Sequence, residues 1–421
     1  MNRWSAAALV VTSMVGTGVF TTTGFLLRDL GAPWLVLALW VAGGVLAACG
    51  AVSYAELSSL VPRNGGEYAL LRRVAHPALG FVAGIVGVFA GFAGPIAASS
   101  LAFGTYLAAA VPGVPVLPAA LVLLFGAALL QGWNPRIGRG LHLWVTALEL
   151  GLVAAFVSLG IAHSAEPLVG PLVTGSTGSV ALGLVFVSYA YSGWNTTAYI
   201  AGELRDPARD GPWSLLVGTA VVTVLYVLLN LAILTAVPPE RLAGVVEVGE
   251  VAARAWLGPV GGRVISGLIA WCLGAMVVAM FEAGPRLTAA IADDVPGIRL
   301  LATRSVHGAP VVAVAGLAVA AAGMATFATF ERLLAWMGIL LAGSTVAVVA
   351  GVMWRRWREP TVHAPFRVPL YPLPPVVFVG ATGWMIAQAL VSDPPLALGV
   401  GTLLAVGLAG WFLVGRAEAT R

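Results

Sequence analysis

Residues 13–20, with the sequence SMVGTGVF, lie in the middle of the first long apolar run of the chain, which covers residues 6–27. The run is long enough to cross a bilayer as a helix, but Gly16 and Gly18 flank Thr17 at its centre. Glycine is a weak helix former, so this sequence favours a local unwinding. Unwound backbone is tolerated at membrane depth where it lines a cavity enclosed by protein. A close helix–helix contact through small residues is the alternative interpretation.

A break at this point predicts a chemical property. The backbone N–H groups at the start of the second half-helix lack partners within the helix, and the helix dipole adds positive potential there. Such a helix start suits an anionic group, for example a carboxylate, at the midplane of the membrane.

The composition describes a membrane protein. Of the 421 residues, 59% are apolar and 10% are charged, whereas soluble domains carry about 25% charged residues. Apolar runs recur along the whole chain and predict a polytopic membrane protein without a separate soluble domain. Arg3 leads directly into a full-length span, which argues against a cleavable signal peptide. Cys49 and Cys272 both lie in apolar runs, so we expect neither a disulfide framework nor a metal site.

All 22 basic residues of the chain are arginines, and the chain contains no lysine. The net charge of +4 comes without a basic stripe interleaved with aromatic residues, so nucleic-acid binding is not expected. With an even number of spans and the N-terminus inside, 17 of the 22 arginines fall on the inside, and the asymmetry predicts that both termini are cytoplasmic.

Twelve spans are expected, and a segment at residues 238–261 reads as an outside loop that carries a short amphipathic helix. The expected spans are residues 5–27, 33–61, 78–111, 115–132, 141–163, 179–202, 212–237, 262–292, 309–328, 331–354, 372–391 and 395–415.

The sixth span resembles the first in its centre. Residues 189–195, with the sequence YAYSGWN, are polar for a span and poor in helix formers. Interrupted spans in corresponding positions indicate an inverted-repeat transporter with its site at the midplane, whereas a polar helix face packed on its neighbours is the alternative. The predicted division is residues 1–163 for the first repeat, 164–354 for the second, and 355–421 for spans 11 and 12 with a cytoplasmic tail.

Several short motifs occur in order along the chain: GTGVF at 16–20, SYAEL at 53–57, PRNGGEY at 62–68, SGWN at 192–195 with GELRDP at 202–207, GPRL at 284–287, and FRVPL at 366–370. Together they resemble the pattern of the amino acid–polyamine–organocation (APC) transporters, in particular the L-type and cationic amino acid transporter branches. The resemblance covers about residues 5–391. It implies the all-α LeuT-type fold with a 5+5 inverted repeat, and transport of an amino acid or amine by alternating access.

The resemblance also implies roles for individual residues. The substrate carboxylate would meet N–H groups and a hydroxyl in the first break, and the amino group would meet main-chain carbonyls at the ends of the half-helices, which is the polarity that helix dipoles favour. Tyr189 would be an aromatic gate, with plain packing as its alternative, and Trp194 and Asn195 would shape the pocket. The implied substrate-binding residues are Met14, Gly16, Thr17, Gly18, Tyr189, Ser192, Gly193 and Trp194.

Glu149 lies well inside span 5, where an unpaired carboxylate is costly and is therefore a functional candidate. Many related transporters carry a lysine in this region, and a chain without lysine departs from that pattern. Two hypotheses follow: Glu149 carries a coupling proton, because burial favours its neutral form, or it stays ionised and binds a cation or a cationic substrate. A structural hydrogen bond to a neighbouring span is the alternative.

Other polar residues near the spans carry weaker expectations. Glu56 and Glu203, at span ends, are candidates for gate or loop salt bridges, for instance with Arg63 or Arg205, or are simply hydrated. Glu282 is expected to pair with Arg286 one turn away, with a role as substrate ligand as the alternative. Tyr106, Ser344 and Thr345 are further pocket candidates, although hydroxyls inside spans often bond to their own helix.

The function that these observations favour is secondary active transport of an amino acid, most simply a neutral one, across the cytoplasmic membrane with coupling to protons. An exchanger with a cationic substrate and a non-transporting amino acid sensor are the alternatives. The scattered histidines show no catalytic spacing, so an enzyme is not expected, nor is a cofactor or metal. Substrate, protons and membrane lipid are the expected partners. No cysteine occupies an outside loop, so a disulfide-linked accessory subunit is not expected.

Overall fold

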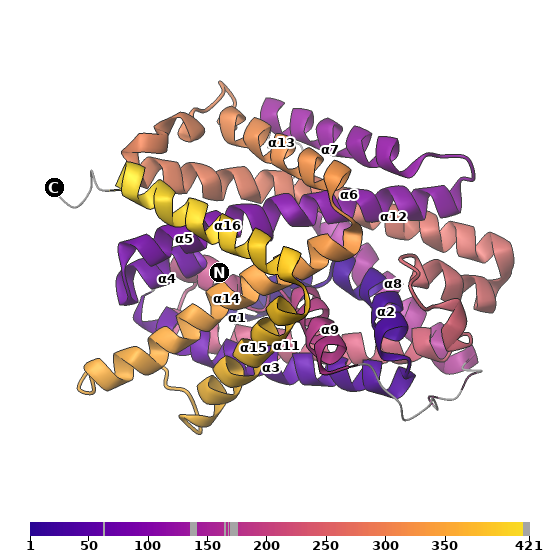
Figure 1. Cartoon of the computed structure of the whole chain (residues 1–421), viewed down its shortest axis with the longest axis horizontal. Coiled ribbons are helices and arrows are strands. Elements are labelled where there is room, and N and C mark those ends of the chain that lie inside the picture. Colours follow the sequence, from indigo (N-terminus) through magenta and orange to yellow (C-terminus); the bar gives the residue numbers. More distant parts are fainter. Residues whose placement is uncertain (62–63, 135–140, 164–165, 167, 169–175, 416–421) are drawn as a thin grey trace.

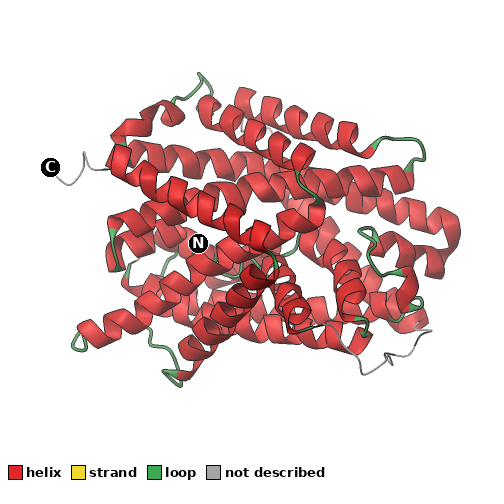
Figure 2. Ribbon diagram, viewed as in Figure 1, coloured by secondary structure: helices red, strands yellow, loops and turns green. Residues whose placement is uncertain are grey.

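The computed structural model of the chain describes all residues except 62–63, 135–140, 164–165, 167, 169–175 and 416–421. Within the described part, the chain is built from helices and contains no strand, apart from one isolated bridge between Arg304 and Pro310 (Figure 2). Eight described helices are long and apolar enough to cross a membrane, one bent pair makes a further span, and three shorter apolar helices complete the twelve expected spans.

Spans 1 and 6 are both broken at their centres, as the sequence predicts. Span 1 consists of α1 (Arg3–Met14) and α2 (Thr17–Leu30), which are bent by 43° at the break. Span 6 consists of α9 (Thr177–Ala190), a turn over residues 191–195, and the short α10 (Thr196–Tyr199).

The remaining spans are close to their predicted positions. Span 3 contains an unpredicted π-helical segment, η1 (Phe89–Ala93). The loop at residues 238–261 carries the expected short helix as the first part of α12 (Val248–Asp294), which turns at Gly258 into span 8. The other elements are α3 (Pro33–Leu60), α4 (Gly66–Val74), α5 (Pro77–Val88), α6 (Gly94–Ala110), α7 (Val116–Trp133), α8 (Leu141–His163), η2 (Ala201–Glu203), α11 (Pro207–Leu234), η3 (Pro239–Arg241), α12 (Val248–Asp294), η4 (Pro296–Ala302), α13 (Val311–Phe327), α14 (Phe330–Arg358), α15 (Leu373–Ser392), α16 (Pro394–Gly410) and η5 (Trp411–Gly415).

The helices pack in two groups that meet at the broken spans. Helices α6, α7, α12 and α13 lie side by side in one group, and α1, α3 and α11 pack together in the other (Figure 1). The two broken spans contact each other through both pairs of halves, α1 with α10 and α2 with α9. The breaks therefore lie together in the interior of the bundle.

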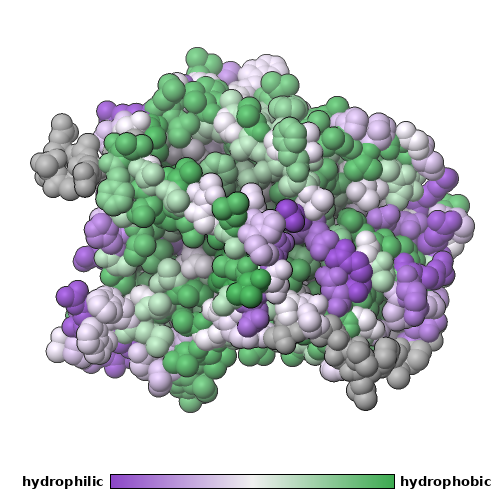
Figure 3. Space-filling model, viewed as in Figure 1, coloured by the Kyte–Doolittle hydropathy of each residue, from purple (hydrophilic) through white to green (hydrophobic). Residues whose placement is uncertain are grey.

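The outer surface is apolar, as a lipid-facing surface requires. Large side chains such as Val122, Leu129, Val319 and Leu398 are 70% or more exposed. Figure 3 shows apolar residues over much of the visible face, with hydrophilic residues at its left and right sides and in one group right of its centre. Exposed apolar surface on this scale is a liability in water and is stable in a bilayer. The chain is a multi-pass membrane protein.

Candidate functional site

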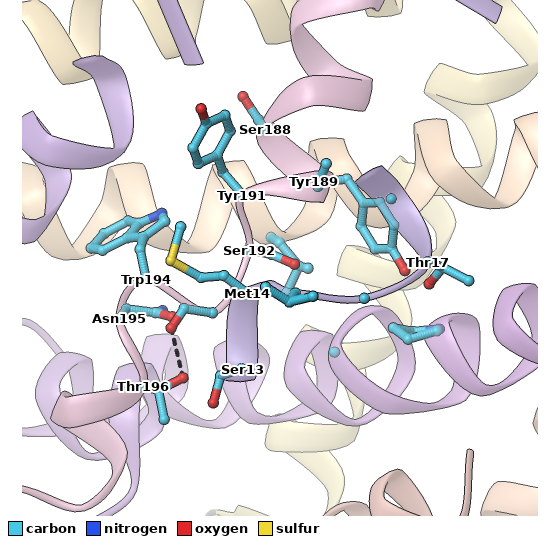
Figure 4. A pocket seen from close by; sticks show the side chains of 18 of the residues that line it. Ser13, Met14, Thr17, Ser188, Tyr189, Tyr191, Ser192, Trp194, Asn195 and Thr196 are labelled. Carbon is cyan, nitrogen blue, oxygen red and sulfur yellow. Dashed lines mark hydrogen bonds between the residues drawn. The ribbon is translucent and has the colours of Figure 1, made fainter. Parts of the chain in front are cut away.

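A cavity of about 580 Å³ lies between the two broken spans and the neighbouring helices. All eight predicted substrate-binding residues line it, and Glu149 lines it from α8. Figure 4 shows the end of α1 beside the end of α9 and the turn that follows it, with the Tyr189 hydroxyl directed toward Thr17 and the Tyr191 ring directed away from it. The structure thus brings together residues that are more than 170 positions apart in the sequence.

The start of α2 opens onto the cavity as predicted. Gly16 is the N-cap of α2, and no side chain caps this helix start, so its first N–H groups are available for a ligand. The Thr17 hydroxyl lies 3.2 Å from the Ser99 hydroxyl on α6. Dipole and free N–H groups make this helix start suited to a carboxylate.

The two breaks touch where small residues face each other. A Cβ placed on Gly18 would lie 2.6 Å from the Cα of Ala190, and one placed on Gly193 would lie 2.4 Å from the carbonyl oxygen of Ser13. Gly193 also has φ +105°, which disfavours any residue with a side chain. The small-residue contact and the helix break, which the sequence offers as alternatives, therefore occur together.

Tyr189 is buried in the cavity wall, and its hydroxyl points toward Thr17 (Figure 4). Trp194 packs edge-on against Tyr54 of α3, with ring centroids 4.8 Å apart, and against Phe378 of α15. Trp194 thus packs against its neighbours, and both aromatic residues line the cavity.

The half-helix carbonyls that were predicted to bind an amino group already have partners. The Tyr226 hydroxyl of α11 donates to the Met14 carbonyl, at 2.5 Å, and lies 3.2 Å from the Ala190 carbonyl. The Tyr189 carbonyl accepts from the Ser192 N–H at 2.9 Å. The Tyr191 N–H also bonds to the Tyr189 carbonyl. Because a carbonyl oxygen can accept two hydrogen bonds, the Met14 and Ala190 carbonyls can still accept from an ammonium group. Tyr226 thereby joins the C-terminal ends of α1 and α9.

Glu149 is 8% exposed, and its carboxylate has no hydrogen-bond or ion-pair partner among the residues that the structure describes. A structural hydrogen bond, the alternative interpretation, is thus not found within the described part of the chain. The position is favourable for a neutral carboxyl group or for a carboxylate that binds a cation.

Glu67 is a buried carboxylate that also lines the cavity, and the sequence did not single it out. Glu67 and Glu149 are the only acidic residues among the described lining residues, and no arginine or histidine occurs among them. The lining therefore offers nothing to neutralise an anionic side chain on a substrate.

Glu56 forms a salt bridge, as expected, but with Arg356 of α14. The Arg356 Nε donates to Glu56 Oε1 at 2.8 Å, and the Val368 N–H donates to Oε2 at 2.8 Å. The suggested partner Arg63 lies outside the described residues. Glu203 forms no ion pair with Arg205 in the described part. The Asn64 amide nitrogen lies 3.4 Å from Glu203 Oε1, which is longer than the usual N–H···O hydrogen bond.

Three further expectations can be compared with the structure. The ion pair between Glu282 and Arg286 is confirmed at 3.0 Å. Thr345 lines the cavity, but its hydroxyl donates to Ala342 of its own helix, and Ser344, which bonds to Leu341, is not among the lining residues. The pocket role of Tyr106 is wrong.

Tyr106 serves a different contact. Its hydroxyl donates to the Phe20 carbonyl at 2.8 Å and accepts from the Gly249 N–H at 3.3 Å, so it joins α6 to α2 and to the start of α12. The hydroxyl is engaged away from the cavity because this face of α6 meets α2 and the start of α12.

The sequence model of the family described as amino acid permease matches residues 1–413. The chain is similar to the Asc-type amino acid transporter 1 of Mus musculus, with 27% identity over 95% of this chain and 78% of the relative. It is also similar to the large neutral amino acids transporter small subunit 2 of Mus musculus, with 25% identity over 97% and 80%. The cystine/glutamate transporter of Homo sapiens is 25% identical over 96% of this chain and 83% of its own length.

Proposed function

Because the chain belongs to the amino acid permease family and is an amino acid transporter, not an enzyme, we propose that it carries a neutral amino acid together with a proton, by alternating access around the cavity between the broken spans. The Glu149 carboxyl group is the observation that carries the proposal. It faces the cavity, is buried, and has no partner in the described part of the structure that would stabilise its charge.

The proposed substrate follows from the lining. Main-chain groups at the two breaks would bind the carboxylate and the ammonium group that all amino acids share. A neutral side chain is favoured because the described lining holds no basic residue and because Glu67 already accepts three hydrogen bonds. One zwitterion and one proton would move one positive charge per cycle.

The proposed setting is the cytoplasmic membrane, with both termini in the cytoplasm, as the distribution of arginines favours. Residues 1–163 and 164–354 would be the two inverted repeats. Both cysteines are free and lie within spans, so we propose that the transporter works without a disulfide-linked accessory chain.

The test is uptake by purified protein in liposomes, with a panel of radiolabelled amino acids, with and without an inward proton gradient and with and without unlabelled amino acid inside. Wild-type protein should take up substrate into empty vesicles when the gradient is imposed. Glu149→Gln should lose this gradient-driven uptake while retaining exchange. Glu282→Gln is the matched control, because Glu282 is a buried carboxylate in a span that is paired with Arg286, and it should keep the response to the gradient.

Two results would contradict the proposal. Normal uptake by Glu149→Gln with unchanged pH dependence would show that Glu149 carries no coupling proton. Wild-type uptake into preloaded vesicles alone would establish exchange and leave Glu149 as a ligand for a cationic substrate, which a preference for arginine or lysine in the panel would reveal.

A further inference from the structure

Glu67 is held by three side chains that come from different parts of the fold. It lies in the first turn of α4 and is 5% exposed. Its Oε1 accepts from the Tyr54 hydroxyl of α3 at 2.9 Å and from the Asn195 amide in the span 6 turn, and its Oε2 accepts from the Tyr199 hydroxyl of α10. We call Tyr54, Glu67, Asn195 and Tyr199 the span 6 clasp.

Two glycines allow α4 to begin directly against α10. Gly65 and Gly66 have φ values of +128° and +53°, which are unfavourable for residues with side chains. A Cβ on Gly66 would lie 2.4 Å from the Tyr199 ring, and the Gly65 N–H donates to the Tyr199 carbonyl at 3.2 Å. The Tyr199 ring therefore lies over Gly66, and its hydroxyl reaches the carboxylate of Glu67, the next residue.

The clasp continues to the substrate cavity. The Tyr54 ring contacts the Trp194 ring, and Trp194 and Asn195 both line the cavity from the turn that joins α9 to α10. The same turn touches the last turn of α1 through Gly193. Glu67 thus fixes, directly or through one intervening ring, the part of span 6 that forms one wall of the site.

The hydrogen bonds of Glu67 distinguish it from Glu149. Three donors converge on the Glu67 carboxylate, which is the arrangement that stabilises a buried acceptor, whereas Glu149 has none in the described part of the structure. A substrate ammonium group would have to displace an existing donor to bind Glu67. The geometry suits a group that holds protein elements in place better than one that binds a ligand.

From these contacts we infer that Glu67 is a positioning residue for transport: it fixes the second half of span 6 against α3 and α4, and substrate affinity depends on it through Trp194 and Asn195. This inference rests on the proposed function only where it concerns substrate affinity. The fixing of span 6 can be tested without any substrate.

The first experiment is hydrogen exchange measured by mass spectrometry on the purified full chain in nanodiscs. In Glu67→Gln the amide cannot accept from all three donors, so exchange in peptides covering residues 191–204 should rise about ten-fold, the factor expected for the loss of one charge-assisted hydrogen bond. Glu282→Gln is the control, because it neutralises a buried carboxylate outside the clasp. Its exchange over residues 191–204 should match the wild type. Unchanged exchange in Glu67→Gln, or an equal rise in both variants, would overturn the inference.

The second experiment separates affinity from rate with L-leucine and L-alanine as probes in liposomes. Glu67→Gln should raise KM about ten-fold with a smaller change in the maximal rate, and Tyr199→Phe, which removes one of the three donors, should give a smaller rise. A lower maximal rate at unchanged KM would overturn the positioning role. If wild-type protein transports neither probe, the proposed substrate class is wrong. The hydrogen-exchange comparison of Glu67→Gln with Glu282→Gln still tests the clasp.

Discussion

Replacing Tyr226 by phenylalanine removes one hydroxyl and leaves the packing of the ring in place. In the structure this hydroxyl lies 2.5 Å from the Met14 carbonyl and 3.2 Å from the Ala190 carbonyl, the ends of α1 and α9. Tyr226 is fully buried against Trp40 and Tyr191, so water cannot readily take the place of the hydroxyl. The variant therefore leaves buried acceptors without a donor, which costs about 1–3 kcal/mol.

Part of this free energy should appear in substrate affinity, because the two half-helix ends that the hydroxyl joins line the cavity. About 1.4 kcal/mol corresponds to a ten-fold rise in KM, which liposome uptake of a neutral amino acid can measure. Tyr106→Phe is the matched control: it also removes a fully buried hydroxyl that has two hydrogen bonds, but away from the cavity. Both variants should lower the thermal unfolding midpoint, and only Tyr226→Phe should raise KM. A wild-type KM in Tyr226→Phe would refute the reasoning.

Two further substitutions test the packing of the fold. Gly18→Ala should abolish uptake, because its Cβ would lie 2.6 Å from the Ala190 Cα, whereas Gly151→Ala, with open space around its Cβ, should transport normally; active Gly18→Ala in the uptake assay would show that the breaks can separate. Glu56→Gln should lower the free energy of unfolding by about 3 kcal/mol, because it leaves the Arg356 guanidinium unpaired in a mostly buried site; a calorimetric midpoint like that of the wild type would mean that the pair is solvated.

The broken spans could be predicted because glycine and polar residues stand out within apolar runs. Gly16, Gly18 and Gly193 interrupt helix formation by their own conformational preferences, and Glu149 stands out because a carboxylate inside a span is rare. These signals are local and do not depend on how the helices are arranged.

Residues whose role depends on helix orientation could not be found in the same way. Tyr226 lies on α11, an apolar helix whose sequence does not show which face meets the two breaks. Glu67 lies beside loop residues in the sequence. It is buried because the backbone turn at Gly65 and Gly66 places the start of α4 against Tyr199. The partner of Glu56 came from α14, 300 positions away, because sequence proximity to Arg63 says nothing about which span ends meet.

The near-contact of Gly18 and Ala190 has a consequence for redesign. Where the two breaks meet, the wall of the cavity is made of main chain, so substitutions there disturb the part of the site that would recognise any amino acid. Side chains such as Phe92 and Phe378 form other parts of the wall, whereas Met276 packs against Gly16 of the first break. Recognition of the groups common to all amino acids and selectivity for a side chain would then depend on separate surfaces. A library that alters substrate range would vary Phe92 and Phe378 and keep the glycines fixed.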